Sequence, residues 1–267
     1  MNAEALFSSM PDIRLVQVEI YSNPGRYSYD NSLRTEEKGF VIQQTLQGSA
    51  YFVEDGVRKR VGAGQAMLFG YAENTQYGLD RDCDLPYGLC WILLTGGAGL
   101  HSLVREIRWR FGSVLQMSEK GEAAELLRRC HEDFVSGNFR DRWFMAENVY
   151  RLLFALYREQ VAGIQGNDPV SYGRYLLETQ FRSPRNLKEW VGEIGITREH
   201  FTREFHARYG ESPAGFLRRL RLEHARGLLR NHTLSLQDVA QASGFASAQT
   251  FHRAYKNHFG CAAGGHR

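Results

Sequence analysis

The sequence predicts an α+β protein in which a β-rich N-terminal domain precedes an all-α C-terminal domain. Short apolar stretches separated by turn residues fill about the first hundred residues, which is typical of strands. After Gly99, apolar residues recur at helical spacing. The length of 267 residues suits two domains, which we expect at residues 1–165 and 170–267.

Short strands with frequent turn signals predict a small barrel or a sandwich for the first domain. Residues 15–20 alternate between apolar and other residues, and Glu54-Asp55-Gly56 is typical of a hairpin turn. The expected strands cover residues 15–20, 40–46, 49–53, 57–61, 65–69 and 87–94.

Helices are expected after these strands, at residues 100–111, 119–135 and 142–161. The last two carry apolar stripes, which would pack on each other or on a second subunit. The segment 162–167 is polar and contains glycine, and Pro169 follows it. We therefore expect the domain linker in this segment.

Composition excludes several classes of protein. Because 43% of the residues are hydrophobic, the chain can bury a sizeable core, and disorder over most of its length is excluded. No apolar run approaches the roughly 18 residues of a membrane span, and the first residues do not resemble a secretory signal. The four cysteines lack CxxC spacing, so neither a disulfide framework nor a zinc site is expected. We expect a cytoplasmic protein.

Charge divides the chain into two parts. Residues 171–267 hold 15 Lys and Arg against 8 Asp and Glu, whereas residues 1–170 hold 18 against 22. Seven of the nine histidines also follow residue 170. A basic C-terminal part on an acidic N-terminal part indicates a polyanionic partner for the former.

The C-terminal domain contains an internal repeat. Residues 187–195 align with residues 236–244, and the alignment resumes downstream after one inserted residue. Each copy predicts a short helix, a glycine turn and a second helix, which is a helix-turn-helix (HTH) arrangement. We expect the two HTH motifs at about residues 187–208 and 236–258.

The second helix of each motif carries a polar face. In a DNA major groove, arginine pairs with guanine and glutamine with adenine, and each bidentate contact contributes about 1–3 kcal/mol of discrimination. A merely solvated face would be the better interpretation of one such helix, but two copies in a basic domain favour DNA contact. The candidate DNA-binding residues are Arg198, Glu199, Thr202 and Arg203 in the first motif, and Ser247, Ala248, Gln249, His252 and Arg253 in the second.

Residues 213–229, between the two motifs, predict a helix. Ser212 suits its N-cap and Pro213 its first position. About 16 helical residues span about 24 Å. Such a helix would hold the two DNA-contacting helices nearly one turn of duplex apart, which is about 34 Å.

Residues 171–267 resemble the DNA-binding domain of the AraC/XylS family of bacterial transcription regulators. The resemblance rests on the segments 201–213, 216–226, 239–245 and 251–260. It implies that the second helix of each motif enters a major groove, with both grooves on one face of the DNA. By position, the family's base-contacting places match Glu199, Thr202 and Arg203 in the first motif, and Ala248, Gln249, His252 and Arg253 in the second.

The chain departs from the family pattern at two places. The family usually has a small residue where this chain has Val191. It usually ends in a segment that contains serine and proline, where this chain has residues 261–267.

The resemblance also implies an N-terminal cupin-like β-barrel followed by helices used for dimerisation. Residues 62–69 resemble the cupin turn-and-strand element. Catalytic cupins hold a metal through histidines and a carboxylate, but residues 1–170 contain only His101 and His131, both outside the expected barrel. We therefore expect no enzymatic activity, no metal and no cofactor.

The interior of such a barrel could hold a small molecule. Polar side chains on the strands would contact it, and Trp91 would offer a stacking surface for a sugar. Each candidate could equally be an ordinary strand or core residue. The candidate effector-binding residues are Arg26, Gln43, Gln44, Tyr51 and Trp91.

The predicted function is that of a sequence-specific DNA-binding transcriptional regulator controlled by a small-molecule effector such as a sugar. The expected partners are double-stranded DNA, the effector, a second copy of the chain and, if the protein is an activator, RNA polymerase; no membrane partner is expected. Two alternatives remain open. One is a DNA-binding regulator without an effector, whose barrel serves only for assembly. The other is a non-metal binding protein built on the cupin-like barrel.

Overall fold

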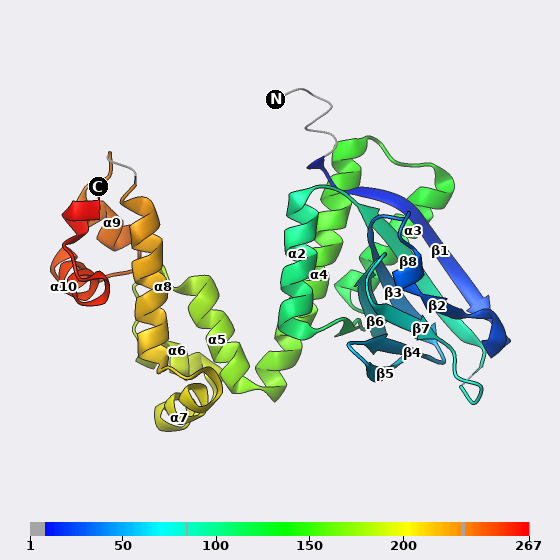
Figure 1. The fold of residues 1–267 in the computed structure, drawn as a ribbon, viewed down its shortest axis with the longest axis horizontal. Coiled ribbons are helices and arrows are strands. Elements are labelled where there is room, and N and C mark those ends of the chain that lie inside the picture. Colours follow the sequence, from blue (N-terminus) through cyan, green and yellow to red (C-terminus); the bar gives the residue numbers. More distant parts are fainter. Residues whose placement is uncertain (1–8, 84, 231–232, 267) are drawn as a thin grey trace. The chain divides into compact units, whose positions relative to one another are not determined.

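The computed structural model describes residues 9–83, 85–230 and 233–266 (Figure 1). The chain forms two compact units, of which the N-terminal unit ends at Ala162 and the C-terminal unit begins at Gly163. Antiparallel sheets dominate the first unit and helices form the second. The predicted α+β class is therefore confirmed.

Two antiparallel sheets form the strand region of the N-terminal unit, and every strand expected from the sequence is present in them. The larger sheet has the order β1-β8-β3-β6-β9, and the smaller has the order β2-β7-β4-β5. The strands are β1 (Asp12–Tyr21), β2 (Ser28–Asp30), β3 (Phe40–Gln47), β4 (Ser49–Glu54), β5 (Val57–Gly62), β6 (Gln65–Gly70), β7 (Thr75–Gly78), β8 (Tyr87–Thr95) and β9 (Val114–Gln116).

The sequence did not predict β2, β7 and β9, each of which is only three or four residues long. Such segments are too short to show an alternating pattern. The expected hairpin turn is confirmed, because Asp55 and Gly56 both have positive φ, of 50° and 73°, between β4 and β5. Two 3₁₀ turns flank β2, η1 (Pro24–Arg26) and η2 (Asn31–Leu33).

The inner strands of the five-stranded sheet, β3, β6 and β8, are largely buried on both faces. Along β3, Val41 points into an aromatic-rich core between the two sheets, which also contains Phe52 and Phe69. The next residue, Ile42, points to the opposite face and joins a core shared with the helices. Three helices cover that face (Figure 1), α2 (Ala98–Phe111), α3 (Glu122–Ser136) and α4 (Arg142–Asn167).

The expected linker, residues 162–167, is helical and forms the end of α4. The helix stops at Asn167 because the next residues begin another helix. Asp168 caps α5 by accepting a hydrogen bond from the backbone N–H of Ser171 at 3.2 Å, and Pro169 occupies the first position of α5.

The described secondary structure of the C-terminal unit consists of helices, and its repeat is visible in the helix caps. Asn186 and Ser235 each form a capping box at the start of the first helix of a motif. Thr197 and Ser247 cap the second helices, each accepting from a backbone N–H at 3.2 Å. The helices are α5 (Pro169–Gln180), α6 (Leu187–Ile194), α7 (Arg198–Tyr209), α8 (Pro213–Leu228), α9 (Leu236–Ala242) and α10 (Ala248–Phe259), followed by η3 (Ala263–His266).

Each HTH motif has its own hydrophobic core. Phe201 and Phe205 of α7 are fully buried in the first core, which α5 also lines. Phe251 and Tyr255 of α10 are fully buried in the second. The long helix α8 contributes its N-terminal half to the first core and its C-terminal half to the second.

Gly173 allows α5 to approach α7 closely. A Cβ at this position would lie 2.4 Å from Cε2 of Phe201 and 2.8 Å from Cδ1 of Ile194. We predict that Gly173→Ala lowers the free energy of unfolding of the C-terminal unit by about 1–3 kcal/mol through overpacking. Denaturant unfolding followed by circular dichroism measures this change.

Gly192 of α6 is the matched control, because nothing lies within 4 Å of its Cβ position. We expect Gly192→Ala to leave stability unchanged or to raise it by up to about 1 kcal/mol, since alanine has the higher helix propensity. Equal stabilisation by both substitutions would contradict the close packing of α5 on α7.

Candidate DNA-binding surface and effector cavities

The polar face expected on the second helix of each motif is exposed to solvent. In α7 and α10, the buried aromatic residues lie one turn apart and face the core, so the opposite side of each helix is free of packing. Arg198, Glu199, Arg203, Ser247, Gln249 and Arg253 are exposed, whereas Thr202, Ala248 and His252 are half-buried.

Two of the candidates in the second motif have a structural role. Ser247 is the N-cap of α10, and its hydroxyl accepts from the backbone N–H of Thr250 at 3.2 Å. Ala248 packs against the core of the second motif. Among the candidates in the second motif, the polar side chains that remain for contact outside that core are therefore those of Gln249, His252 and Arg253.

The equivalent arginines of the two motifs differ in their partners. Arg203 contacts Nδ1 of His200 at 2.9 Å and donates to Glu204 at 3.2 Å. Arg253 makes no hydrogen bond or ion pair with any other described residue. The Arg203–Glu204 pair is exposed and contributes only about 0–1 kcal/mol, so the Arg203 side chain can leave it at little cost. His200 was not among the candidates, although it lies one turn before Arg203.

The structure brings two of the five effector candidates together. Gln43 and Trp91 line a cavity of about 80 Å³ between the two sheets. The side-chain amide of Gln43 donates to the hydroxyl of Tyr87 at 3.1 Å, and Nε1 of Trp91 donates to Oε1 of Glu19 at 2.7 Å.

The other three candidates lie elsewhere. Gln44 points to the opposite face of β3 and donates to the backbone oxygen of Met117 at 3.3 Å. Tyr51 lies under the guanidinium of Arg58, 3.7 Å from the ring centroid, and lines a separate hollow of about 400 Å³. Arg26 is exposed in η1 and lines neither cavity.

Tyrosines, which the sequence analysis did not select, make up much of the wall of the 80 Å³ cavity. Arg34 lies over one of them, Tyr71, at 3.8 Å from the ring centroid. The hydroxyl of Tyr27 is buried and has no hydrogen-bond partner, and burial raises the pKa of Tyr27 well above its ordinary value. This hydroxyl therefore stays protonated and can donate to a bound molecule. The lining tyrosines are Tyr21, Tyr27, Tyr29, Tyr71 and Tyr77.

A clustering of tyrosines in the sequence could have indicated this cavity. Seven of the 13 tyrosines fall between residues 21 and 87, although that stretch is only a quarter of the chain. Their alternation on short strands brings several of them to one interior.

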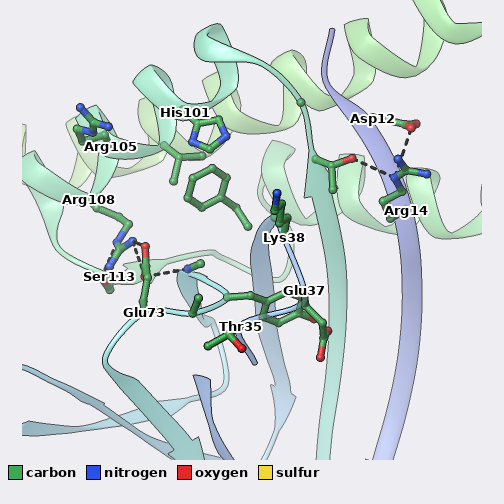
Figure 2. A pocket seen from close by; sticks show the side chains of 18 of the residues that line it. Asp12, Arg14, Thr35, Glu37, Lys38, Glu73, His101, Arg105, Arg108 and Ser113 are labelled. Carbon is green, nitrogen blue, oxygen red and sulfur yellow. Dashed lines mark hydrogen bonds and ion pairs between the residues drawn. The ribbon is translucent and has the colours of Figure 1, made fainter. Parts of the chain in front are cut away.

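A third and larger cleft of about 1510 Å³ lies between α2 and the rim of the sheets (Figure 2). His101 and Arg105 of α2 lie on one side of it, and Lys38 lies on another. Lys38 and Arg105 make no hydrogen bond or ion pair with other described residues.

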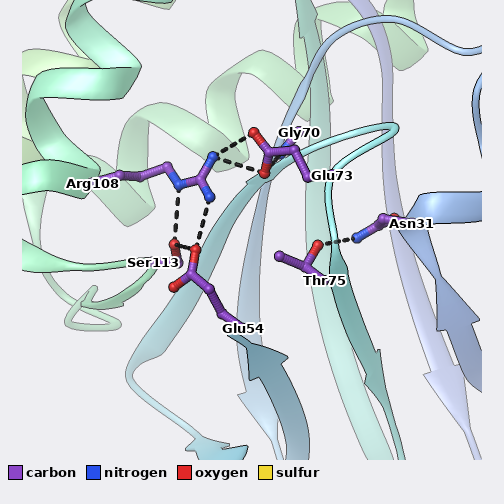
Figure 3. Close-up of polar contacts among 7 residues, drawn as sticks. All are labelled: Asn31, Glu54, Gly70, Glu73, Thr75, Arg108 and Ser113. Atoms are coloured by element: carbon purple, nitrogen blue, oxygen red, sulfur yellow. Dashed lines mark hydrogen bonds and ion pairs between the residues drawn. The ribbon is translucent and has the colours of Figure 1, made fainter. Parts of the chain in front are cut away.

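An ionic network at this cleft ties α2 to the strands (Figure 3). Arg108 donates to both oxygens of Glu73, at 2.6 and 2.8 Å, and to Glu54 at 2.8 Å. Ser113 accepts from Arg108 at 3.0 Å and donates to Glu54 at 2.7 Å. Because the two glutamates bond to residues 35 to 59 positions away in sequence, no local pattern predicts the network.

Glu54 and Arg108 remain ionised at neutral pH. Burial alone would raise the pKa of Glu54, but hydrogen bonds from Ser113 and Arg108 outweigh it, and the pKa is lowered. Burial alone would lower the pKa of Arg108, but Glu73 and Glu54 outweigh it, and the pKa is raised. Arg108 is therefore paired with carboxylates of the protein itself.

In the part of the chain that the structure describes, no helix combines the length and apolarity that a bilayer span requires. Among the same residues, His, Cys, Asp and Glu do not gather in groups of three or more that could hold a metal.

The chain is similar to bacterial regulators over most of its length. The Msm operon regulatory protein of Streptococcus mutans is 21% identical over 243 residues, which cover 88% of this chain and 84% of that protein. The lactose operon transcription activator of Staphylococcus xylosus is 22% identical over 234 residues, which cover 85% and 83%.

A third relative, the virulence regulon transcriptional activator VirF of Yersinia enterocolitica, is 30% identical over 96 residues. This match covers 36% of this chain and 35% of VirF, so the chain spans about a third of that protein.

Two family models match separate parts of the chain. The model of the AraC-like ligand binding domain matches residues 24–153, which contain the strands, α2, α3 and the start of α4. The model of the helix-turn-helix domain matches residues 190–267, which contain both HTH motifs. With both regions matched, the chain belongs to the AraC family of DNA-binding transcriptional regulators.

Proposed function

We propose that this AraC-family regulator contacts bases with both α7 and α10, binds a sugar in its N-terminal unit and works as a homodimer. The observation that carries the proposal is the pair of equivalent, exposed polar faces on α7 and α10. They occur in a region that holds 15 Lys and Arg against 8 Asp and Glu. Two such helices in one basic unit fit successive major grooves. The protein is thus a regulator that acts in the cytoplasm and not an enzyme.

The chemistry of the two faces suits base contact. Arg203 and Arg253 can each donate to O6 and N7 of guanine, and Gln249 can pair with adenine. Glu199 is repelled by phosphates and would accept from N4 of cytosine or disfavour other sequences. Arg198 lies at the start of α7 and is within reach of phosphate.

A sugar is the effector class that the observations favour. The two long matches among the relatives are named for the Msm and lactose operons, and the N-terminal unit matches a ligand binding domain. The cavity beside Gln43 and Trp91 offers an aromatic wall and the buried Tyr27 hydroxyl. Its volume of about 80 Å³ is small, so side chains such as Arg34 must move when a ligand enters.

A stripe of exposed aromatic side chains on α4 fits a second copy of the chain. Trp143 is 57% exposed and Phe154 is 48% exposed. Tyr150 stacks on Phe154, with ring centroids 6.1 Å apart. These residues share one helix face at helical spacing, and exposed apolar stripes of this kind mark interaction surfaces. RNA polymerase is a further partner if the protein activates transcription, as two of the three relatives do by name.

The first prediction from this proposal concerns DNA contact by the two equivalent arginines. If they contact guanines, Arg203→Ala should relax base preference at one position by about 1–3 kcal/mol, and Arg253→Ala should do so about one helical turn away. Selection of sites from a random duplex pool measures both effects. Arginines that only touch phosphate would weaken binding to all sequences alike and lower the salt slope by about one unit. Unchanged site preference and salt slope in both variants would refute the assigned face.

The second prediction concerns the effector. A saturating sugar should stabilise the protein by about 2.7 kcal/mol at 100 times its Kd, which a thermal-shift panel of mono- and disaccharides detects. Gln43→Leu should abolish this shift because its amide faces the cavity. Gln44→Leu is the matched control, since that buried amide points to the opposite face of β3. DNA binding without a shift for any sugar would favour a regulator whose barrel serves only for assembly.

The third prediction concerns assembly. Phe154→Glu should convert a dimer into a monomer, because a buried carboxylate without a partner is strongly unfavourable. Light scattering of the full chain at tens of micromolar measures the mass. Val135→Glu is the control, since it alters another exposed apolar residue, on α3. A wild-type monomer, with and without sugars, would rule out the α4 interface.

A further inference from the structure

The two HTH motifs of the C-terminal unit are separate bodies that must keep a fixed separation to use both recognition helices, α7 and α10. Their hydrophobic cores share no residue, and α8 is the helix that enters both. In Figure 1, α8 runs between α5 and α9. A single helix does not by itself fix the angle between two bodies packed at its ends. The contacts along the middle of α8 therefore decide how firmly the motifs are held.

Arg221 lies at the middle of α8 and forms hydrogen bonds to the loop after α5. Its Nε donates to the backbone oxygen of Phe181 at 2.8 Å, and its Nη2 donates to those of Ser183 at 2.7 Å and Arg185 at 3.1 Å. These carbonyls follow the end of α5, where helical partners are lacking. A planar guanidinium can bind several acceptors at once in a fixed geometry.

Arg221 differs from its charged neighbours on α8. Arg219 pairs with Glu211 and Glu223, whereas Arg221 makes no ion pair with a described residue. Burial lowers the pKa of Arg221, and its hydrogen-bonding partners are all backbone carbonyls. Because the half-buried guanidinium of Arg221 already donates to three carbonyls of one loop, it links α8 to that loop and is not available to phosphate.

The second motif packs against the same loop. A Cβ on Gly244, in the turn of the second motif, would lie 2.4 Å from the backbone oxygen of Phe181 and 2.9 Å from Nε of Arg221. The ring of Phe181 also meets His224 edge-on at 5.3 Å, and Nδ1 of His224 lies 3.2 Å from the hydroxyl of Ser243. The loop therefore touches α8 and the second motif together.

We propose that Arg221 is a positioning residue that fixes the separation and angle of α7 and α10, and thereby the spacing between the two halves of the DNA site. The residue acts through the loop at residues 181–185 and contacts no DNA itself. Without this tie, α10 would sample several placements relative to α7, and each would suit a different spacing. Affinity for one spacing would fall, and discrimination between spacings would fall with it.

The test uses the full chain and duplexes that the wild-type protein selects from a random pool. The test rests on the proposed function, in which both helices contact bases. Affinity is measured for the selected duplex and for the same duplex with one base pair inserted between its halves. The insertion rotates the halves by roughly a tenth of a turn. Wild-type protein should lose about tenfold or more in affinity, because the two helices cannot follow.

In Arg221→Met, which keeps the apolar stem, the loss caused by the insertion should shrink to about threefold or less. Arg218→Met is the matched control. It removes the same charge from the same helix, and Arg218 is exposed and makes no hydrogen bond or ion pair with other described residues. The control should keep the wild-type ratio between the two duplexes, even if both affinities fall through lost phosphate contact.

Arg221→Lys provides a second variant in case the methionine variant does not fold, which circular dichroism would reveal. An ammonium cannot reproduce the forked contacts to three carbonyls, so an intermediate ratio is expected. A folded Arg221 variant that discriminates spacing as strongly as the wild type would overturn the positioning role. If the selected duplexes share sequence in only one half of the site, the proposal that both helices contact bases is overturned instead.

Discussion

The central strand β3 of the five-stranded sheet is largely buried on both faces, and the alternation of its side chains decides which residues fill each face. Ile42 and Gln44 point to the side covered by helices, whereas Val41 and Gln43 point between the two sheets. The helix side is filled mainly with aliphatic residues. The inner side is rich in tyrosine, which supplies hydroxyls that need partners. The same strand thus supports a closely packed helix layer and a polar, aromatic interior.

The parts of the fold that sequence analysis predicted are those with local causes. Alternation, the Asp55-Gly56 turn and the caps at Asn186, Thr197, Ser235 and Ser247 act within a few residues, so their signals lie in the sequence itself. The repeat was visible because both motifs place equivalent aromatic residues in their cores. The short strands and the helical state of residues 162–167 escaped prediction, because neighbours outside the segment set their conformation.

The candidate sites also differ in whether local sequence determines them. Residues on α7 and α10 could be assigned to an exposed face from helical spacing alone. For the effector candidates, strand position alone did not tell which face each side chain occupies, so Gln44 and Tyr51 were grouped with Gln43 and Trp91. Two other sets of contacts join residues that are tens of positions apart. They are the bonds of Arg108 to the glutamates and the bonds of Arg221 to the loop after α5. Such contacts depend on the complete fold and leave no pattern in the sequence.

The separate cores of the two HTH motifs have an evolutionary consequence. Because α7 and α10 each rest on their own aromatic residues, substitutions on one polar face do not disturb the packing of the other. On the proposal that both helices contact bases, each half of the target site can therefore change without the other. The differing partners of Arg203 and Arg253 fit this independence, since equivalent positions on similar scaffolds have different surface contacts. On the same proposal, a lineage could alter half of its DNA preference in a few substitutions and retain a folded protein throughout.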